Sequence, residues 1–135
     1  MAKINQGIKC LVIVMTIRMK PIEYTDDEAM PSRLLRIETS SKPDKKYQAT
    51  FLMKNGKYKG PVHFGAKNYQ DYTTIKDNNE AEKKRQLYIT RHQKKESNLW
   101  KKSPDTPAAL SRFILWEKRN LADAISNFRK IFFLK

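Results

Sequence analysis

The chain has 135 residues, a length that suits one domain with room for an additional arm. Lys and Arg outnumber Asp and Glu by 28 to 14, and the resulting net charge of +14, spread over both halves of the chain, attracts phosphate backbones, anionic lipid and acidic protein surfaces. The single cysteine, Cys10, excludes an intramolecular disulfide and favours a reducing compartment.

The N-terminal part begins with an apolar run. Leu11 to Ile17 is rich in Val and Ile and lacks Gly and Pro, which predicts a mostly buried strand. The whole apolar stretch, Ile8 to Met19, is shorter than the ~20 residues that a bilayer requires and lacks a cleavage site, so we expect no transmembrane segment and no signal peptide. Pro21 ends the run, and the acidic stretch from Glu23 to Pro31 reads as a linker.

A small β-meander follows the linker. Two short runs, Leu34 to Thr39 and Tyr47 to Met53, are separated by turn-forming residues and predict an antiparallel hairpin. Asn55-Gly56 favours a second turn. A third strand is then expected from Lys57, Tyr58 and Val62 to Phe64, with Gly60-Pro61 as one of its bounds.

The second half of the chain has helical periodicity. Asn79 is a candidate N-cap for a helix from Glu80 to about Gln93. Thr106-Pro107 predicts the start of a second helix that continues to Trp116. Asn120 predicts the cap of a third helix, which is amphipathic.

These elements predict an α+β protein in which a small antiparallel β-meander is followed by about three helices. We divide the chain into an extended N-terminal arm with its linker, residues 1–31, and a single α+β domain, residues 32–135. The arm is expected to pair with a neighbouring chain or to pack on the edge of the domain.

The sequence offers little catalytic chemistry. Its Cys10, His63 and His92 are too far apart in sequence for a typical metal site, and four glycines leave little material for a phosphate-binding loop. His92 and Glu96 have i, i+4 spacing and would polarise a water in a nuclease-like site together with Asp71 or His63. A solvated His beside a salt-bridging Glu is the commoner meaning of this spacing, so we expect no enzymatic activity, no cofactor and no small-molecule substrate.

A dense basic run with interleaved Tyr88 and Trp100 is the main candidate binding surface. Its positions wrap much of a helix, which favours a solvated charged face, with contact to nucleic acid or an acidic surface as the alternative. No helix-turn-helix, RNP motif or zinc finger points to sequence reading. The candidate contact residues are Lys83, Lys84, Arg85, Arg91, Lys94, Lys95, Lys101 and Lys102.

A protein interface is expected at both ends of the chain. Phe132, Phe133 and Leu134 form an apolar C-terminal end that extends past the predicted core face of the last helix, so a partner is expected to bury it. From the arm, Val12 and Val14 are the candidate interface residues. Substitution of Phe133 is expected to impair this interface more than the stability of the free protein.

Several short sequence motifs from Phe64 onward occur together in this chain. Their combination is far more specific than any one of them. They are Phe64-Gly65-Ala66-Lys67, Asp71-Tyr72-Thr73, Lys76-Asp77, Tyr88-Ile89-Thr90-Arg91-His92, Lys95-Glu96 with Trp100, Ser111-Arg112, Leu115-Trp116 with Lys118, and Leu121 with Ala124-Ile125. Through them, residues 33–132 resemble a family of short, uncharacterised basic proteins of large double-stranded DNA viruses of algae and amoebae, the nucleocytoplasmic large DNA viruses. Residues 1–30 and the stretch from Ser97 to Asp105 depart from the usual pattern of this family.

The resemblance implies a viral protein but no catalytic residues. We therefore expect a structural protein of the virus particle, a minor capsid or capsid-associated protein that cements larger coat proteins, located in the virion and in the host cytoplasm during assembly. Its expected partners are other viral capsid proteins, with nucleic acid as a further partner. The alternative is a nucleic-acid-binding virion protein without sequence specificity. A phosphate-dominated contact weakens steeply with salt, whereas an interface built on apolar anchors largely survives it.

Overall fold

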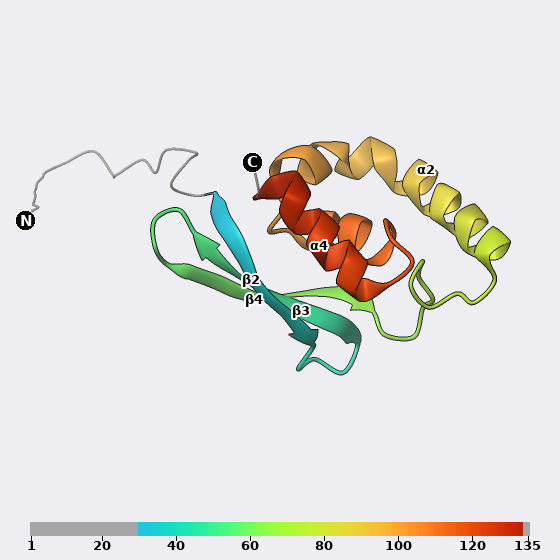
Figure 1. Ribbon diagram of the computed structural model, residues 1–135, viewed down its shortest axis with the longest axis horizontal. Coiled ribbons are helices and arrows are strands. Elements are labelled where there is room, and N and C mark those ends of the chain that lie inside the picture. The colour runs from blue at the N-terminus through green and yellow to red at the C-terminus, as the bar shows by residue number, and fades with distance from the viewer. Residues whose placement is uncertain (1–29, 134–135) are drawn as a thin grey trace, which may run out of the picture.

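The structure, a computed structural model, describes residues 30–133. It has an α+β fold in which three strands precede the helices, as the sequence predicts (Figure 1). The elements are β2 (Pro31–Thr39), β3 (Lys45–Met53), β4 (Tyr58–Ala66), α2 (Asn78–Lys102), α3 (Pro107–Leu110), the π-helix η1 (Ser111–Leu115) and α4 (Leu121–Phe132). Residues 1–29 of the predicted N-terminal arm and linker lie outside the described residues, whereas Pro31, which the sequence placed in the linker, begins β2.

The strands form an antiparallel sheet with the order β2-β3-β4. Leu34 pairs with Phe51 across the first ladder, and Tyr47 pairs with Phe64 across the second. Leu34, Phe51 and Phe64 are buried, so alternation along each strand places their side chains on the covered face of the sheet. The predicted meander is confirmed.

The third strand is longer than predicted, because β4 runs through Gly60-Pro61 instead of being bounded there. Gly60 has a φ of +133°, and a Cβ at this position would lie 2.7 Å from the carbonyl oxygen of Ala49. The absence of a side chain at Gly60 therefore allows β4 to remain beside β3 at this irregular point of the ladder.

Helix α2 is also longer than predicted. Its N-cap is Asp77, whose carboxylate accepts a hydrogen bond of 2.7 Å from the backbone N–H of Glu80, instead of Asn79. It continues past Gln93 to Lys102, and the residues between these two include no Pro or Gly that would end a helix. Tertiary packing stabilises this C-terminal extension, because Trp100 in the last turn is buried.

The other two helix starts agree with the sequence. Thr106 caps α3 with Pro107 at its first position, and the backbone then widens into the π-helix η1 at Ser111–Leu115. The side chain of Asn120 accepts a hydrogen bond of 2.8 Å from the N–H of Asp123 and caps α4. The predicted second helix thus exists as two short segments of different pitch.

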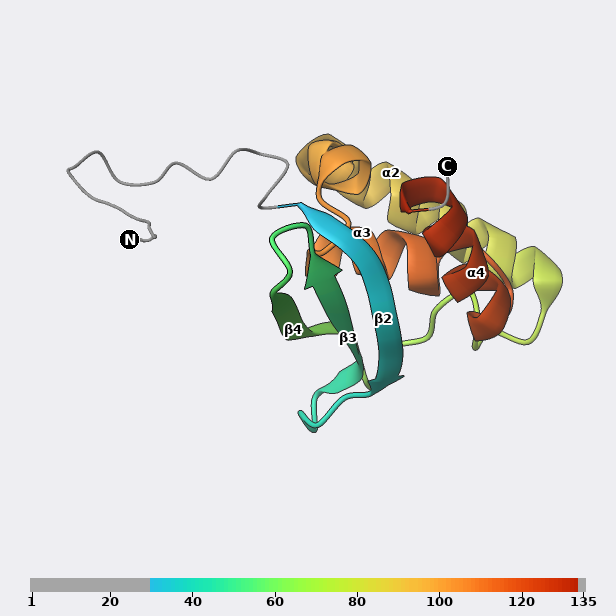
Figure 2. The same cartoon turned by 60° about the vertical axis from the view of Figure 1, so that its left-hand side comes forward.

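The described domain has three layers (Figures 1 and 2). Helices α3, η1 and α4 lie on one face of the sheet, and α2 lies on the outer side of these helices. Among the described residues, no helix covers the opposite face of the sheet (Figure 2). The core between sheet and helices contains the buried residues Leu34, Ala49, Phe51, Met53, Phe64, Leu110, Ile114, Leu115 and Phe128.

Candidate nucleic-acid interface

Helix α2 is a polar helix on the outside of the domain. Of its 25 residues only Ala81 and Trp100 are buried. At 1.5 Å per residue it is about 37 Å long. A helix of this kind gains little from burial, so most of its surface is free for electrostatic contacts.

The basic residues of α2 lie on one flank. Successive residues of a helix are turned by about 100°, which places seven of the eight candidate contacts within an arc of about 120°. These seven exposed residues are Lys83, Lys84, Arg91, Lys94, Lys95, Lys101 and Lys102. Glu80 in the first turn is the acidic residue in that arc, and a neighbouring stripe of α2 carries Gln86, Thr90, Gln93 and Ser97. With Arg85 the eight candidate positions span about 200° of the helix, and without it the other seven lie on one flank.

In the part of the chain that the structure describes, none of these seven side chains forms an ion pair. We call them the basic flank. They extend over about 28 Å of the helix axis, because Lys83 and Lys102 are 19 residues apart. Unpaired exposed cations in a row attract a polyanion and release its counterions on binding.

Arg85, the eighth candidate, is used inside the protein. Its Nε donates a hydrogen bond of 2.8 Å to the carbonyl oxygen of Trp116, and its Nη2 donates one of 2.9 Å to Glu117. Its Nη1 lies 3.6 Å from Glu82. Arg85 therefore fixes α2 to the segment after η1 instead of contributing a free charge.

Glu117 joins two arginines from different elements. Its Oε1 accepts from Arg85 and also, at 2.6 Å, from Nη1 of Arg112. Burial by itself raises the pKa of Glu117, but the hydrogen bonds and charges of Arg112 and Arg85 hold this pKa below its ordinary value. The ionised carboxylate thus holds the inner side of α2 against η1.

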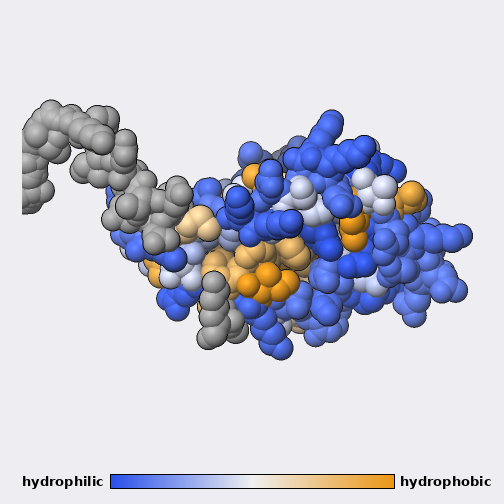
Figure 3. All heavy atoms as spheres, turned by 90° about the horizontal axis from the view of Figure 1, so that it is seen from above, coloured by the Kyte–Doolittle hydropathy of each residue, from blue (hydrophilic) through white to orange (hydrophobic). Residues whose placement is uncertain are grey.

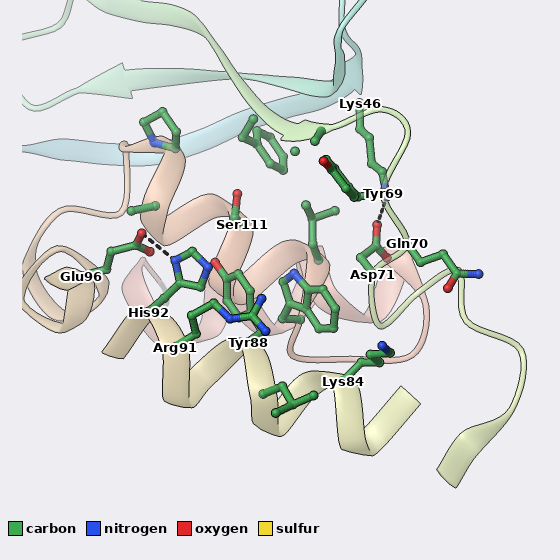
Figure 4. A pocket seen from close by; sticks show the side chains of 18 of the residues that line it. Lys46, Tyr69, Gln70, Asp71, Lys84, Tyr88, Arg91, His92, Glu96 and Ser111 are labelled. Atoms are coloured by element: carbon green, nitrogen blue, oxygen red, sulfur yellow. Dashed lines mark hydrogen bonds and ion pairs between the residues drawn. The ribbon is translucent and has the colours of Figure 1, made fainter. Parts of the chain in front are cut away.

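A cleft of about 870 Å³ lies between α2 and the end of the sheet (Figure 4). Lys84 and Arg91 of the basic flank line it from α2, and Lys45 and Tyr69 line it from the sheet and the loop after β4. Tyr69 is 75% exposed. The cleft therefore has cationic groups on both sides and an accessible aromatic ring, a combination that suits a nucleic-acid strand.

The inner wall of the cleft is aromatic. Tyr88 is stacked on Trp116, with ring centroids 4.9 Å apart, and on His92, at 4.4 Å. Burial, and secondarily the charge of Glu96, raises the pKa of the Tyr88 hydroxyl far above its ordinary value. Tyr88 is therefore neutral over the physiological range and serves as an apolar wall.

His92 and Glu96, the pair of the nuclease-like hypothesis, lie within hydrogen-bond distance of each other. Nδ1 of His92 lies 3.0 Å from Oε2 of Glu96, while Oε1 of Glu96 is buried without a hydrogen-bond partner among the described residues. Asp71 lines the same cleft, whereas His63 lies on β4 with its Nδ1 2.7 Å from the hydroxyl of Ser40. Of the four residues in the nuclease-like hypothesis, three thus share one cleft.

Asp71 organises the loop instead of facing a ligand. It is 2% exposed, and its carboxylate accepts hydrogen bonds from Lys46 and from the N–H of Thr73, the latter at 2.8 Å. Both of its oxygens have donors. These contacts within the protein favour a structural role for Asp71.

The two predicted interface residues that the structure describes, Phe132 and Phe133, do not line this cleft. Phe132 and Phe133 are half-buried and pack on the core cluster, with Phe133 6.4 Å from Phe51 and 5.9 Å from Phe128 between ring centroids. They are thus part of the aromatic cluster of the protein itself. Leu134, Val12 and Val14 lie outside the described residues.

Among residues 30–133 there is no group of three or more His, Cys, Asp or Glu side chains placed to hold a metal ion. Within the same residues, no helix has the length and apolar character needed to span a membrane.

The sequence did not single out Lys45 and Lys46, which line the cleft from β3. They form a Lys-Lys pair at the start of a strand, nearly 40 residues before the nearest member of the basic flank. Sequence distance hides this contribution, because β3 and α2 line the same cleft only in the folded protein. The Lys46–Asp71 ion pair is part of that fold.

One protein family is similar to part of this chain. The sequence model of a family described as "Family of unknown function (DUF5754)" matches residues 35–92. The match extends from within β2 to His92 in α2 and therefore includes most of the sheet, the Asp71 loop and three of the seven residues of the basic flank. No curated protein and no solved structure matches the chain.

Proposed function

We propose that this protein binds nucleic acid through the phosphate backbone, without reading sequence, as a component of a large DNA virus particle. The observation that carries the proposal is the basic flank of α2, seven exposed cations without acidic partners among the described residues. Its extent of about 28 Å suits several successive phosphates. The Arg85–Glu117–Arg112 contacts hold α2 so that this flank faces outward.

The cleft supports the same proposal. Lys84 and Arg91 belong both to the basic flank and to the cleft lining, so a strand held along α2 passes its entrance. The exposed ring of Tyr69 offers a stacking surface for an unpaired base. Base stacking of this kind tolerates any sequence, in keeping with the lack of a base-reading motif.

The test compares two variants of equal net charge in fluorescence anisotropy with a labelled duplex at several salt concentrations. The flank variant replaces four flank lysines with glutamine: Lys83, Lys84, Lys94 and Lys95. The control replaces four exposed lysines on other elements or loops: Lys42, Lys57, Lys118 and Lys130. If each flank lysine contacts a phosphate, the slope of log K against log salt falls by about 3–4 in the flank variant and much less in the control. Equal losses in both variants contradict the proposal, because total charge alone then explains binding.

A second candidate function is the cementing of larger coat proteins. It is supported by the sheet face that no described helix covers, where half-buried Leu52 pairs with Tyr58, which is 73% exposed. The double variant Leu52→Ser and Tyr58→Ser should lower incorporation into particles while nucleic-acid binding is retained. Unchanged incorporation argues against this role.

A further inference from the structure

A second groove lies between the start of β2, the end of α2 and the end of α4. It has a volume of about 1170 Å³. Apolar residues of four separate segments line it, namely Met30, Pro31, Trp100, Pro104, Phe113, Ile131, Phe132 and Phe133. Viewed from above, the molecule shows apolar side chains gathered among hydrophilic ones (Figure 3). Ile131 is 45% exposed.

The size of the groove favours a chain segment as its occupant. Small-molecule pockets usually have roughly 300–1,000 Å³ and a few convergent polar groups. This groove is larger, and eight of its 13 lining residues are aliphatic or aromatic, the others being three lysines and two serines. An extended apolar peptide fits such a surface better than a polar metabolite does.

The chain itself supplies an apolar segment next to the groove. Met30 and Pro31 line it, so the preceding residues enter the described domain at the groove. Leu11 to Ile17 is a run of seven residues of which six are apolar. The 13 residues from Ile17 to Met30 can span up to about 45 Å, so their length allows this run to fold back onto the groove.

Charge complementarity supports the same occupant. Lys101 and Lys102 line the groove, are exposed and form no ion pair among the described residues. The segment between Leu11–Ile17 and the groove carries four acidic residues, Glu23, Asp26, Asp27 and Glu28, against two basic residues, Arg18 and Lys20, which lie directly after the run. When the apolar run lies in the groove, this acidic stretch is held near the two lysines.

The exposed edge of β2 is a less suitable place for the run. Arg129 of α4 donates hydrogen bonds to the carbonyl oxygens of Leu34, at 3.1 Å, and Leu35, at 3.2 Å. Its guanidinium therefore occupies backbone acceptors that an added strand would need.

We propose that the segment Leu11–Ile17 docks in cis in the groove formed by the start of β2, the end of α2 and the end of α4. The docked run covers Ile131 and Phe133, and Val12 and Val14 are then contacts within one chain.

The native cysteine makes a direct test possible. Cys10 adjoins the run and is the single cysteine of the chain, so one added cysteine gives one defined disulfide. Ile131→Cys places the second thiol in the groove. Ala122→Cys is the control, since it is exposed on α4, nine residues earlier, on the opposite side of the helix and about 13 Å away along its axis. A parallel pair uses Thr16→Cys in a Cys10→Ser background, so that the result does not depend on one register.

Mild oxidation of the full chain at low concentration should give an intrachain disulfide with position 131 about tenfold or more faster than with position 122, in at least one of the two pairs. Interchain dimers that form specifically through position 131 overturn the proposal, because a second copy then fills the groove. Equal rates at both positions in both pairs overturn it as well.

A second measurement does not depend on disulfide geometry. Val12→Asp combined with Val14→Asp should uncover the groove and raise the fluorescence of a hydrophobic dye by about twofold or more, while far-ultraviolet circular dichroism is unchanged. Lys101→Gln with Lys102→Gln should raise it less. No increase in dye fluorescence with the double aspartate variant contradicts docking in the groove. None of these readouts involves nucleic acid, so they can fail while the proposed function stands.

Discussion

Tyr88 of α2 lies nearly parallel to Trp116, with ring centroids 4.9 Å apart and planes inclined by 9°. Trp116 directly follows η1, so this stack links the polar outer helix to the helical layer on the sheet. Together with the Arg85–Glu117 ion pair, at 2.9 Å, it fixes the rotation of α2 about its own axis. That rotation decides which flank of α2 faces outward.

The Glu117 carboxylate is expected to stabilise the protein in a pH-dependent way. Glu117→Gln removes charge-assisted hydrogen bonds to two arginines and should lower the free energy of unfolding at pH 7 by about 2 kcal/mol. The pKa of Glu117 is lowered in the folded state from its ordinary value of 4.5. Its contribution is therefore fully present above that value and is lost as pH falls through the lower folded pKa.

The measurement is denaturant unfolding of wild type and variant between pH 7 and pH 3. The difference between the two should be constant down to about pH 5 and shrink below it. Glu38→Gln is the control, because Glu38 forms an exposed pair with Arg36, and it should cost less than about 1 kcal/mol. A Glu117→Gln difference that grows as pH falls is incompatible with a lowered pKa.

Gly65 is expected to be intolerant of a side chain. Its φ is +80°, and a Cβ there would lie 2.9 Å from Cδ1 of Leu115. Gly65→Ala should cost about 2 kcal/mol, from backbone strain and from displacement of the buried Leu115 side chain. Gly56→Ala isolates the backbone part, since Gly56 has a φ of +88° and nothing within 4 Å of its added Cβ, and should cost about 1 kcal/mol. Equal losses would mean that the Leu115 side chain moves aside without penalty.

Phe133 is expected to contribute to stability, in contrast to the interface role inferred from sequence. Its ring contacts Phe51 and Phe128, so Phe133→Ala should lower the melting temperature of the free protein. Because the ring is half-buried, a loss of about 1–2 kcal/mol is expected, against about 3–5 kcal/mol for Phe128→Ala, whose ring is fully buried. An unchanged melting temperature with reduced incorporation into particles would restore the interface role.

Nucleic-acid binding is expected to be independent of sequence. Six of the seven residues of the basic flank are lysines. A lysine ammonium group interacts with a phosphate as a point charge and does not make the bidentate contacts that an arginine makes. Competition between two unrelated duplexes of equal length should therefore show less than about a tenfold difference in affinity at physiological salt. A preference of about a hundredfold or more at that salt would point to base contacts and contradict backbone binding.

Local sequence signals determined much of the fold. The turn residues around Asn55-Gly56 and the caps Thr106 and Asn120 act over a few residues, and the predicted meander and helix starts follow from them. The basic character of α2 was likewise visible in the sequence. Residue type and short spacing carry this information, because caps and turns satisfy backbone hydrogen bonds locally.

Only the tertiary structure decided which basic side chains are used in contacts within the protein and which residues line the cleft across from α2. Arg85 has the same charge as its neighbours in the sequence, yet long-range contacts to Trp116 and Glu117 bind it inside the protein. Lys46 reaches the cleft because Asp71 binds it across the loop after β4. The extension of α2 past Gln93 and the packing of Phe133 on Phe51 also come from contacts between distant segments. Such contacts depend on how the layers pack, which local sequence patterns do not specify.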